Sequence, residues 1–339
     1  MQHPPASGKS VTIYDVARAA GVSASTVSRA FARPGRVSFA TAEKIRQVAA
    51  ELGYRSMEMR RPMPEGKERH GTIALVIADI SNPVYFEMIR GAEEEAAKNG
   101  YTMLLANTRE SGIVEREAIE RSLGIVDGIV LSSSRMSDAG IRSMAKQKPT
   151  IVMNRGVSGV ASVVTDNERG IIRAVTHLRE LGHRNIAYLA GPEASWANGM
   201  RWRALKMCAA EHGHKSLLFS PRVPTIAAGA QIADQVLSSN ATAVLAYNDQ
   251  LAIGFMRQAQ KNGFDVPGDI SVVGFDNSSD ADLVTPGLTS VAAPLHALGA
   301  AAVRNLLAIA RGAADAPDRP VVLPTRLAVR GSTAAPPRG

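Results

Sequence analysis

Residues 71–330 alternate short apolar runs with helical stretches, and this alternation constrains the fold more than any other feature of the chain. The runs are rich in Val, Ile, Leu and Ala, which is typical of parallel strands covered by helices on both faces. We therefore predict an α/β body with doubly wound parallel sheets, whose length fits two lobes better than one. The predicted strands are 72–78, 102–106, 128–131, 150–153, 162–164, 185–190, 243–246 and 271–275, and the predicted helices are 84–98, 115–123, 168–180, 200–212, 231–237 and 250–261.

Polar side chains gather where these predicted strands end. Because open α/β sheets bind ligands beyond the carboxyl ends of their strands, several such ends together predict one polar cleft. Loops are polar in most proteins, so no single residue of this kind identifies a site by itself. The residues at strand ends are Asp79, Asn82, Ser132, Ser133, Ser134, Asn154, Arg155, Asn248, Asp249 and Asp276.

Residues 12–52 form a separate pattern of three short helices. Thr12 can cap the first helix together with Asp15, and Gly21 supplies the left-handed residue that ends it. Ser23 caps a second helix, Ala24 to Phe31, and Ser38 caps the third, which Gly53 terminates. Two helices joined by a glycine turn are the helix-turn-helix pattern of DNA-binding proteins.

The second helix has side chains suited to reading DNA. Val27 faces inward, so small or polar residues and one arginine face outward. Small residues let a helix enter a major groove about 12 Å wide, and an arginine can pair with guanine through two hydrogen bonds. Hydroxyl groups near the helix ends can donate to phosphates, which set register. The predicted outward-facing residues are Ala24, Ser25, Ser28 and Arg29, and the predicted phosphate contacts are Thr12, Tyr14, Ser23 and Thr26.

Positive charge is concentrated at the same end of the chain. Residues 1–70 contain twelve Lys or Arg and six Asp or Glu, which gives +6 of the net +8 of the whole chain. Such a balance indicates a polyanionic partner. A solvated basic tail is one alternative, but a tail lacks apolar residues at helical spacing. A three-helix bundle that packs on another protein surface is the second alternative, and the outward arginine favours DNA over it.

Composition excludes several classes of protein. No apolar run approaches the roughly 20 residues needed to span a bilayer, and the N-terminal ten residues lack the core of a signal peptide. The single cysteine, Cys208, rules out an intrachain disulfide and a cysteine-cluster metal site. We expect a cytoplasmic protein with no cofactor and no membrane partner. We also expect no enzyme activity, because P-loop, dinucleotide, G-x-S-x-G and H-E-x-x-H motifs are absent from the sequence.

The stretch TIYDVARAAGVSASTVSRAF, followed by VS and ELGY, resembles the N-terminal domain of the LacI/GalR family of bacterial transcriptional repressors. The segments VDGIVL, HLRELGHRNIAYLAGP, AYNDQLAIGFM and DISVVGFDN resemble the effector domain of that family, whose fold is shared with periplasmic sugar-binding proteins. The resemblance runs on through Arg330. It implies two lobes joined by three crossovers, with a small effector between them. It also implies a homodimer that places two DNA-binding domains on a near-palindromic operator.

The resemblance also implies effector contacts, at Tyr85, Phe86, Asn154, Arg201, Asn248 and Asp276. Asn154 stands where the family commonly has Asp, which makes the cleft less acidic. We add Ser134 from its strand end, Arg155 as a cation and Trp196 as a stacking face. Two alternatives stay open: an Asp276–Arg201 ion pair that only ties the lobes together, and a Trp196 side chain that only fills space between them.

Residues 55–70 have the composition of a linker, with Pro62, Pro64 and five Lys or Arg. In the family this segment holds a hinge helix that enters the minor groove, and Arg61 and Met63 match its DNA-contacting positions. Ser56 replaces the usual proline, and Pro62 lies inside the expected helix, where proline costs about 3 kcal/mol. We therefore predict that residues 56–64 are not helical in the absence of DNA.

We therefore expect the sequence to encode a DNA-binding transcriptional regulator, a repressor, controlled by a small sugar or sugar acid. Its expected parts are a DNA-binding unit at 1–54 with residues 1–10 disordered, a hinge at 55–70, a two-lobed body at 71–330 and a flexible tail at 331–339. Two other classes were weighed, an α/β enzyme and a sugar-binding transport receptor. Neither explains residues 12–52.

Overall fold

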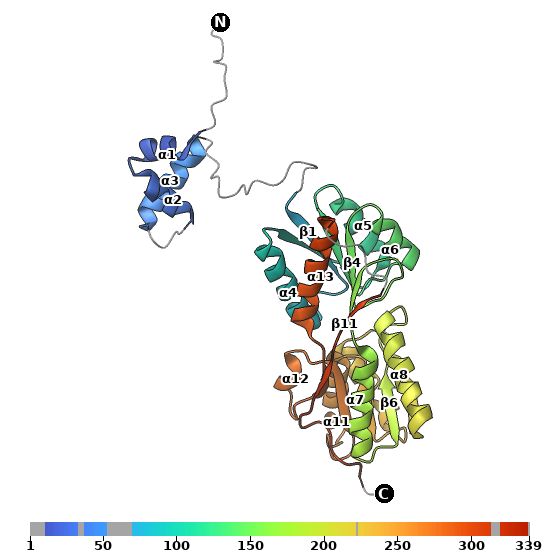
Figure 1. Ribbon diagram of the computed structural model, residues 1–339. Coiled ribbons are helices and arrows are strands. Elements are labelled where there is room, and N and C mark those ends of the chain that lie inside the picture. Colours follow the sequence, from blue (N-terminus) through green and yellow to red (C-terminus); the bar gives the residue numbers. More distant parts are fainter. Residues whose placement is uncertain (1–10, 33–36, 53–69, 222, 313–318, 338–339) are drawn as a thin grey trace. The chain divides into compact units, whose positions relative to one another are not determined.

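A computed structural model describes residues 11–32, 37–52, 70–221, 223–312 and 319–337. The chain divides into two compact units, residues 1–68 and 69–339 (Figure 1). Among the described helices, none combines the length and the apolar character that a bilayer crossing demands.

The first unit is the three-helix arrangement that the sequence predicts. Its helices are α1 (Ile13–Ala20), α2 (Ala24–Ala32) and α3 (Phe39–Glu51). Val16, Val27 and Ile45 are fully buried and form the centre of a small core. Gly21 ends α1 with φ 71°, and Ser38 accepts a hydrogen bond from the Thr41 amide at the start of α3. The caps expected at Gly21 and Ser38 are therefore present, while Gly53, the expected end of the third helix, lies outside the described residues.

The first lobe of the second unit is built on a six-stranded sheet in the order β11-β5-β4-β3-β1-β2, parallel throughout. Its strands are β1 (Thr72–Ile77), β2 (Thr102–Asn107), β3 (Gly128–Ser132), β4 (Thr150–Met153), β5 (Ser162–Thr165) and β11 (Val321–Leu323). Its helices are α4 (Val84–Lys98), α5 (Gly112–Ser122), α6 (Asp138–Ala145) and α13 (Leu295–Ala310). Ile73, Leu75 and Ile77 pack on one face of β1, while Ala74 and Val76 pack on the other. Both faces are thus covered, as the continuous apolar runs predict.

The second lobe repeats this architecture with the order β12-β10-β9-β8-β6-β7. Its strands are β6 (Asn185–Leu189), β7 (Lys215–Phe219), β8 (Ala243–Ala246), β9 (Ser271–Asp276), β10 (Thr289–Ala292) and β12 (Arg326–Ala328). Its helices are α7 (Asn167–Glu180), α8 (Trp196–His212), α9 (Ile226–Gln231), α10 (Ala233–Leu237), α11 (Asp249–Lys261) and α12 (Asp280–Leu283). Only β12 runs antiparallel to its neighbour.

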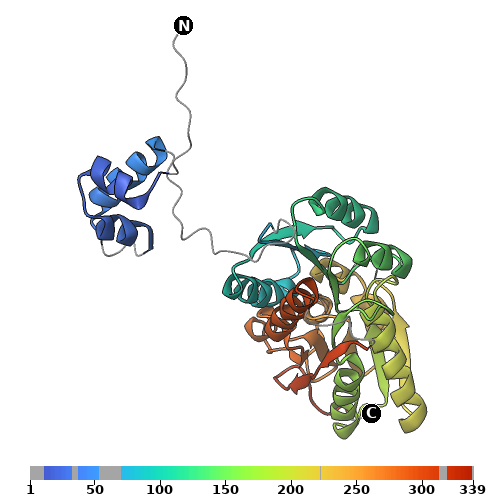
Figure 2. The same ribbon diagram turned by 45° about the horizontal axis from the view of Figure 1, so that its top comes forward.

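The chain passes between the lobes three times. It crosses after β5, returns after β10, and crosses again between β11 and β12. The long return places α13 of the C-terminal part beside α4, as both views of the ribbon show (Figures 1 and 2). Because all three connections lie between the same two sheets, the carboxyl ends of strands from both lobes face one shared space.

The segment after Arg330 differs from the flexible tail that the sequence suggested. Ser332 is fully buried, and its hydroxyl donates to the Val272 carbonyl at 2.6 Å and accepts from the Thr289 amide at 2.8 Å. The Ala334 amide donates to the Ser271 hydroxyl. Backbone and hydroxyl partners at β9 and β10 hold the segment in place, and its small polar residues gave no sign of these contacts.

Candidate functional site

A polar pocket lies between the two lobes, and we call it the inner pocket. Its lining residues come from both sheets and from α4, α8 and the loops between them: Asn82, Val84, Tyr85, Met88, Glu110, Ser133, Arg135, Asn154, Ala197, Arg201, Pro224, Tyr247 and Asp276. The cavity volume is about 40 Å³. A cavity needs about 10–15 Å³ to hold one water, so the inner pocket is narrow in this arrangement of the lobes.

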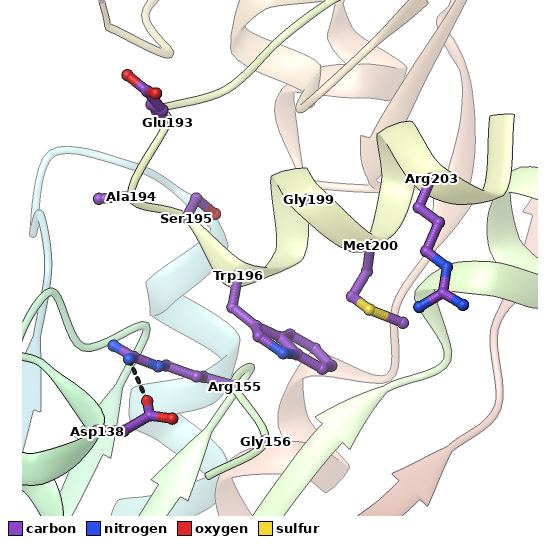
Figure 3. A pocket seen from close by; sticks show the side chains of 10 residues that line it. All are labelled: Asp138, Arg155, Gly156, Glu193, Ala194, Ser195, Trp196, Gly199, Met200 and Arg203. Atoms are coloured by element: carbon purple, nitrogen blue, oxygen red, sulfur yellow. Dashed lines mark hydrogen bonds and ion pairs between the residues drawn. The ribbon is translucent and has the colours of Figure 1, made fainter. Parts of the chain in front are cut away.

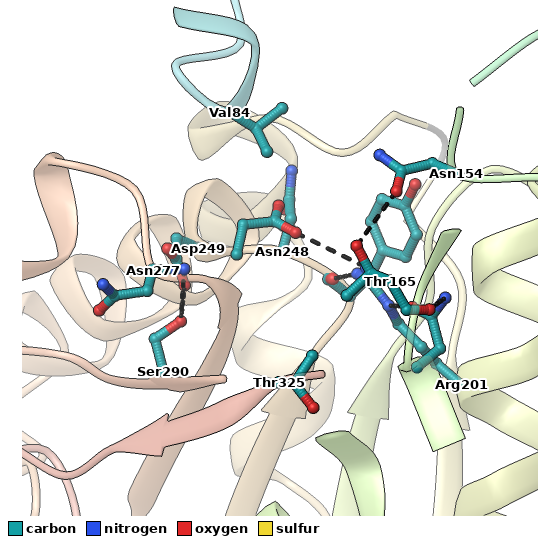
Figure 4. Close-up of polar contacts among 12 residues, drawn as sticks. Val84, Asn154, Thr165, Arg201, Asn248, Asp249, Asn277, Ser290 and Thr325 are labelled. Carbon is teal, nitrogen blue, oxygen red and sulfur yellow. Dashed lines mark hydrogen bonds and ion pairs between the residues drawn. The ribbon is translucent and has the colours of Figure 1, made fainter. Parts of the chain in front are cut away.

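Arg201 is the most constrained side chain of the inner pocket. Its Nε donates to Asn167 Oδ1 at 2.8 Å, and Nη1 donates to the backbone carbonyl of Tyr247. The guanidinium lies over the Phe275 ring, 3.4 Å from its centroid. Figure 4 shows Arg201 among these polar contacts. A guanidinium held on three sides is preorganised, so it can present its remaining donors to a ligand at little entropic cost.

Asp276 lies at the end of β9, with Oδ1 3.6 Å from Arg201 Nη2. Burial raises the pKa of Asp276 to about 7, Arg201 partly offsets that rise, and the neighbouring carboxylate of Asp249 adds to it. Asp249 accepts from the Ser290 hydroxyl at 2.6 Å and from the Ser278 amide at 2.7 Å. Burial likewise raises the pKa of Asp249, to about 6. The second lobe thus offers a carboxyl group that can gain or lose a proton near neutral pH.

The first lobe contributes an ion pair and an amide. Arg135 Nε donates to Glu110 Oε2 at 2.5 Å, and the Arg135 side chain is only 7% exposed. Asn154 Oδ1 accepts from the Thr165 hydroxyl at 3.2 Å (Figure 4), and its amide nitrogen donates to Sδ of Met88, another lining residue, at 3.7 Å. Burial strongly raises the pKa of the Tyr85 hydroxyl, so that it stays a neutral donor and acceptor.

Four pocket residues have left-handed backbone conformations that side chains other than glycine rarely adopt. These are Glu110 (φ 60°), Ser133 (φ 54°), Asn154 (φ 57°) and Asp276 (φ 106°). Each ends a strand or lies within three residues after one, where the chain leaves the sheet. Such conformations cost of order 1–3 kcal/mol each and cluster at sites that need a side chain aimed in a particular direction.

The structure places four of the nine expected effector residues in the inner pocket: Tyr85, Asn154, Arg201 and Asp276. Phe86 does not line the inner pocket and is 57% exposed. It follows Tyr85 directly in α4, and consecutive residues of a helix point to different faces. Asn248 is instead the N-cap of α11, where its side chain accepts from the Leu251 amide and donates to the Pro224 carbonyl.

Ser134 also lies outside the lining of the inner pocket. Its hydroxyl is buried and accepts from the Met136 amide at 3.2 Å, while the left-handed turn at Ser133 directs that neighbouring side chain into the inner pocket. Asn82, one of the strand-end residues expected to form the cleft, does line the inner pocket, whereas the sequence prediction missed the Glu110–Arg135 pair and Tyr247. Position at a strand end was the available signal for Tyr247, which follows β8 directly.

Arg155 and Trp196 line a different cavity, which we call the outer pocket (Figure 3). Its lining residues are Asp138, Arg155, Gly156, Glu193, Ala194, Ser195, Trp196, Gly199, Met200 and Arg203, and its volume is about 500 Å³. The Arg155 guanidinium donates to the Ser134 and Met136 carbonyls and to Asp138 Oδ1. This guanidinium is therefore bound by the first lobe and does not point into the inner pocket.

The predicted DNA-facing residues of the first unit lie at its surface. Tyr14 is 68% exposed, and Ser25 and Arg29 are exposed on α2. The Ser23 hydroxyl accepts from the Thr26 amide at 3.2 Å and lies within hydrogen-bond distance of the Ser25 and Thr26 hydroxyls. Thr12 donates its hydroxyl to Asp15. Ala24, Thr26 and Ser28 are half-buried. The expected hinge contacts Arg61 and Met63, and the prediction for residues 56–64, lie outside the described residues.

Comparison with known proteins accounts for both units. Residues 12–56 match the model of the bacterial regulatory proteins of the lacI family, and residues 175–333 match the periplasmic binding protein-like domain. The HTH-type transcriptional regulator DegA of Bacillus subtilis is 35% identical over 333 residues, which cover 95% of this chain and 98% of DegA. The HTH-type transcriptional repressor CytR of Escherichia coli K12 is 32% identical over 341 residues, with 96% and 97% covered.

Solved structures agree with these relatives. The Lac repressor dimer bound to operator and the anti-inducer ONPF is 27% identical, with a TM-score of 0.75 and coverage of 96% of this chain and 100% of that chain. A transcriptional regulator CelR–cellobiose complex is 29% identical, with a TM-score of 0.72 and coverage of 95% and 99%. A LacI family regulator from Enterococcus faecium with bound ribose is 30% identical, with a TM-score of 0.70 and coverage of 78% and 99%.

Proposed function

The chain belongs to the LacI family of bacterial transcriptional regulators, and we propose that it is a repressor whose operator affinity is set by a polyhydroxylated effector held in the inner pocket. It is a regulator with a DNA-binding domain and an effector-binding domain, and it is not an enzyme. This assignment replaces the two alternatives, an enzyme and a transport receptor, that the sequence left to be weighed.

The observation that carries the effector proposal is the polar inner pocket between the lobes. Asp276 and Arg201 of the second lobe share it with Asn154 and the Glu110–Arg135 pair of the first lobe. A carboxylate accepts from two hydroxyls, an arginine presents several donors, and an amide does both. Ligands bound to the structural neighbours include ribose and cellobiose. A sugar offers the closely spaced hydroxyls that such a set of groups recognises.

The narrowness of the inner pocket links effector binding to lobe movement. With a volume of about 40 Å³ the pocket has space for about three waters. A sugar needs more, so the lobes must part to admit it and then close around it at a different separation. An effector that prefers this separation shifts the population of closure states by its difference in affinity for them.

We propose that the operator is read by α2 and its caps. Arg29 contacts a base edge in the major groove beside Ala24, Ser25 and Ser28, and Thr12, Tyr14, Ser23 and Thr26 contact phosphates. A homodimer presents two such surfaces to the two halves of a near-palindromic operator. Arg61 and Met63 contact the minor groove between the half-sites.

A thermal-shift screen of the full-length protein against pentoses, hexoses, disaccharides and sugar acids tests the effector proposal. An effector stabilises the folded body by mass action, so a ligand at 100 times its Kd raises stability by about 2.7 kcal/mol. The Asp276→Asn variant is the control, since its stabilisation by the same concentration of ligand should be clearly smaller. A screen in which every responding ligand acts equally on both proteins would contradict the proposed site.

A further inference from the structure

We propose that the outer pocket is a second compartment of the effector site and holds the second ring of a two-ring ligand, a disaccharide or similar glycoside, against the Trp196 indole. The inference rests on the proposed function, because it takes the first ring to be a sugar in the inner pocket.

The two pockets share one wall, which is the first turn of α8. Trp196 lines the outer pocket and the next residue, Ala197, lines the inner one. On the facing side of the first lobe, Asn154 lines the inner pocket and Arg155 the outer one. The wall therefore separates two halves of one crevice between the lobes, and parting of the lobes joins them. A ligand with two linked rings can place one ring on each side of the wall.

The volumes of the two halves favour this division. The inner pocket measures about 40 Å³ and the outer pocket about 500 Å³, and small-molecule sites range from about 300 to 1,000 Å³. A ligand confined to the inner pocket would leave this larger space unfilled. A second ring in the outer pocket contacts both lobes, since Arg155 and Gly156 belong to the first and Trp196 and Arg203 to the second. Contacts of the second ring with both lobes therefore increase the difference in ligand affinity between the open and closed arrangements of the lobes.

The chemistry of the outer pocket suits a neutral ring with hydroxyl groups. Trp196 supplies a flat apolar surface, and one edge of its ring lies beside Gly156, where an added Cβ would be 3.6 Å from Trp196 Cζ2 (Figure 3). Aromatic faces bind the apolar face of a sugar, while its hydroxyls need polar partners around the rim. Glu193 and Arg203 supply an acceptor and donors at that rim.

The charges of the outer pocket argue against an anionic ligand. Two arginines, Arg155 and Arg203, line it together with two carboxylates, Asp138 and Glu193, so its formal charge balances. Arg155 is in addition committed to Asp138 at 2.5 Å and to two backbone carbonyls. A phosphate or carboxylate could not pair with Arg155 without displacing these partners, and it would also lie near the carboxylates of Asp138 and Glu193, whereas a neutral glycoside needs neither change.

Tryptophan fluorescence tests the inference directly. The chain has two tryptophans, and Trp202 stacks on Tyr188 with ring centroids 5.6 Å apart, so the Trp202→Phe variant leaves Trp196 as the only indole reporter. Cellobiose, maltose, lactose and melibiose, with glucose and galactose as their component sugars, are titrated into this full-length protein by fluorescence and by calorimetry. We expect at least one disaccharide to change Trp196 emission and to bind at least tenfold more tightly than its component sugars.

Two further variants separate the possible outcomes. Trp196→Ala should reduce disaccharide affinity tenfold or more and leave monosaccharide affinity unchanged, whereas Met207→Ala, on the same helix and 51% exposed, should change neither. Disaccharide binding that survives Trp196→Ala, or monosaccharide binding without any gain for a disaccharide, overturns the inference and leaves the proposed function standing. Sugar affinity that Asp276→Asn leaves unchanged overturns the proposed function. If none of the six sugars binds, the inference fails, and the wider screen with pentoses and sugar acids decides the proposed function.

Discussion

Arg201 and Asp276 form their 3.6 Å ion pair within one lobe, since Arg201 lies on α8 and Asp276 ends β9 of the same sheet region. The pair therefore cannot tie the two lobes together, which was the structural alternative to a ligand-binding role. The other partners of Arg201, Asn167 and Tyr247, also belong to the second lobe. Both charged groups are thus fixed on one side of the crevice and face the first lobe across it.

The raised pKa of Asp276 predicts how stability depends on pH. Its pKa is about 7 in the folded protein and about 3.9 in an unfolded chain. Between these values the folded state binds more protons than the unfolded state. The contribution of Asp276 to the free energy of unfolding is therefore greatest at low pH and falls as pH rises from about 4 to 7. Asp276→Asn should make this decline shallower, as measured by urea unfolding at pH 5 and pH 8. Parallel pH profiles for the two proteins would contradict it.

The same pKa distinguishes the two ligand types that remain open. A neutral sugar donates its hydroxyls to the ionised carboxylate, so its affinity should rise with pH through about 7. A sugar acid would place its own negative charge near Asp276 and should bind more weakly as pH rises. Calorimetric titrations at pH 6 and pH 8 measure the sign, and an affinity that does not change would show that Asp276 does not titrate beside the ligand.

Helices α4 and α13 approach each other closely at two glycines, so a larger residue at either position should lower stability. A Cβ added at Gly91 would lie 2.0 Å from the His296 carbonyl oxygen, and one at Gly299 would lie 2.0 Å from that of Met88. Gly91→Ala should destabilise the protein by about 1–3 kcal/mol, because backbone atoms must separate. Gly199→Ala on α8 meets nothing within 4 Å and should instead stabilise by about 0.5–1 kcal/mol. Equal unfolding midpoints for the two variants would refute the close approach.

The C-terminal segment should be needed for full stability. A chain that ends at Gly331 loses both hydrogen bonds of the Ser332 hydroxyl and leaves the buried Thr289 amide without this partner. Each such loss costs about 1–3 kcal/mol. A chain that ends at Ala335 keeps these bonds and is the matched control. If both truncated proteins melt at the temperature of the full chain, the segment contributes nothing to stability.

Arg29 should read a base. Arg29→Ala is expected to cost about 1–3 kcal/mol on the specific operator and to relax preference at one base pair in each half-site. Arg18→Ala removes an equal charge from α1, where Arg18 lies 3.8 Å from Asp15, and should weaken specific and random DNA alike. Competition binding against random duplex DNA measures both. Equal losses on the two kinds of DNA for Arg29→Ala would place its contact on phosphate.

The DNA-binding unit and the central strands were predictable because their signals are local. Caps at Ser23 and Ser38 and the left-handed Gly21 mark helix ends within a few residues, and continuous apolar runs mark buried strands. Helix α13 went unpredicted for the opposite reason. Only three of its sixteen residues are polar, His296, Arg304 and Asn305, and most of the others outside its buried stripe are Ala, so the contrast between its buried face and its outer face is weak.

The site was only partly predictable because strand ends reveal which residues gather but not where each side chain points. Ser133 and Ser134 are the same residue type at the end of the same strand. The left-handed turn at Ser133 directs the Ser133 side chain into the inner pocket, whereas the Ser134 side chain is buried in the first lobe. Asn248 looked like a ligand contact and serves as a helix cap. The Glu110–Arg135 pair joins residues 25 apart, a separation for which the sequence gives no signal.

Operator release measured as a function of effector concentration tests the central claim most directly. The claim is that a polyhydroxylated effector binds beside Asp276 and Arg201 and so changes affinity for DNA. A charged hydrogen bond contributes about 1.5–3 kcal/mol, so Asp276→Asn should raise the effector concentration for half-maximal response about tenfold or more. Operator affinity without effector should stay unchanged. A variant that responds at the wild-type effector concentration, or one that loses operator binding outright, would contradict this account.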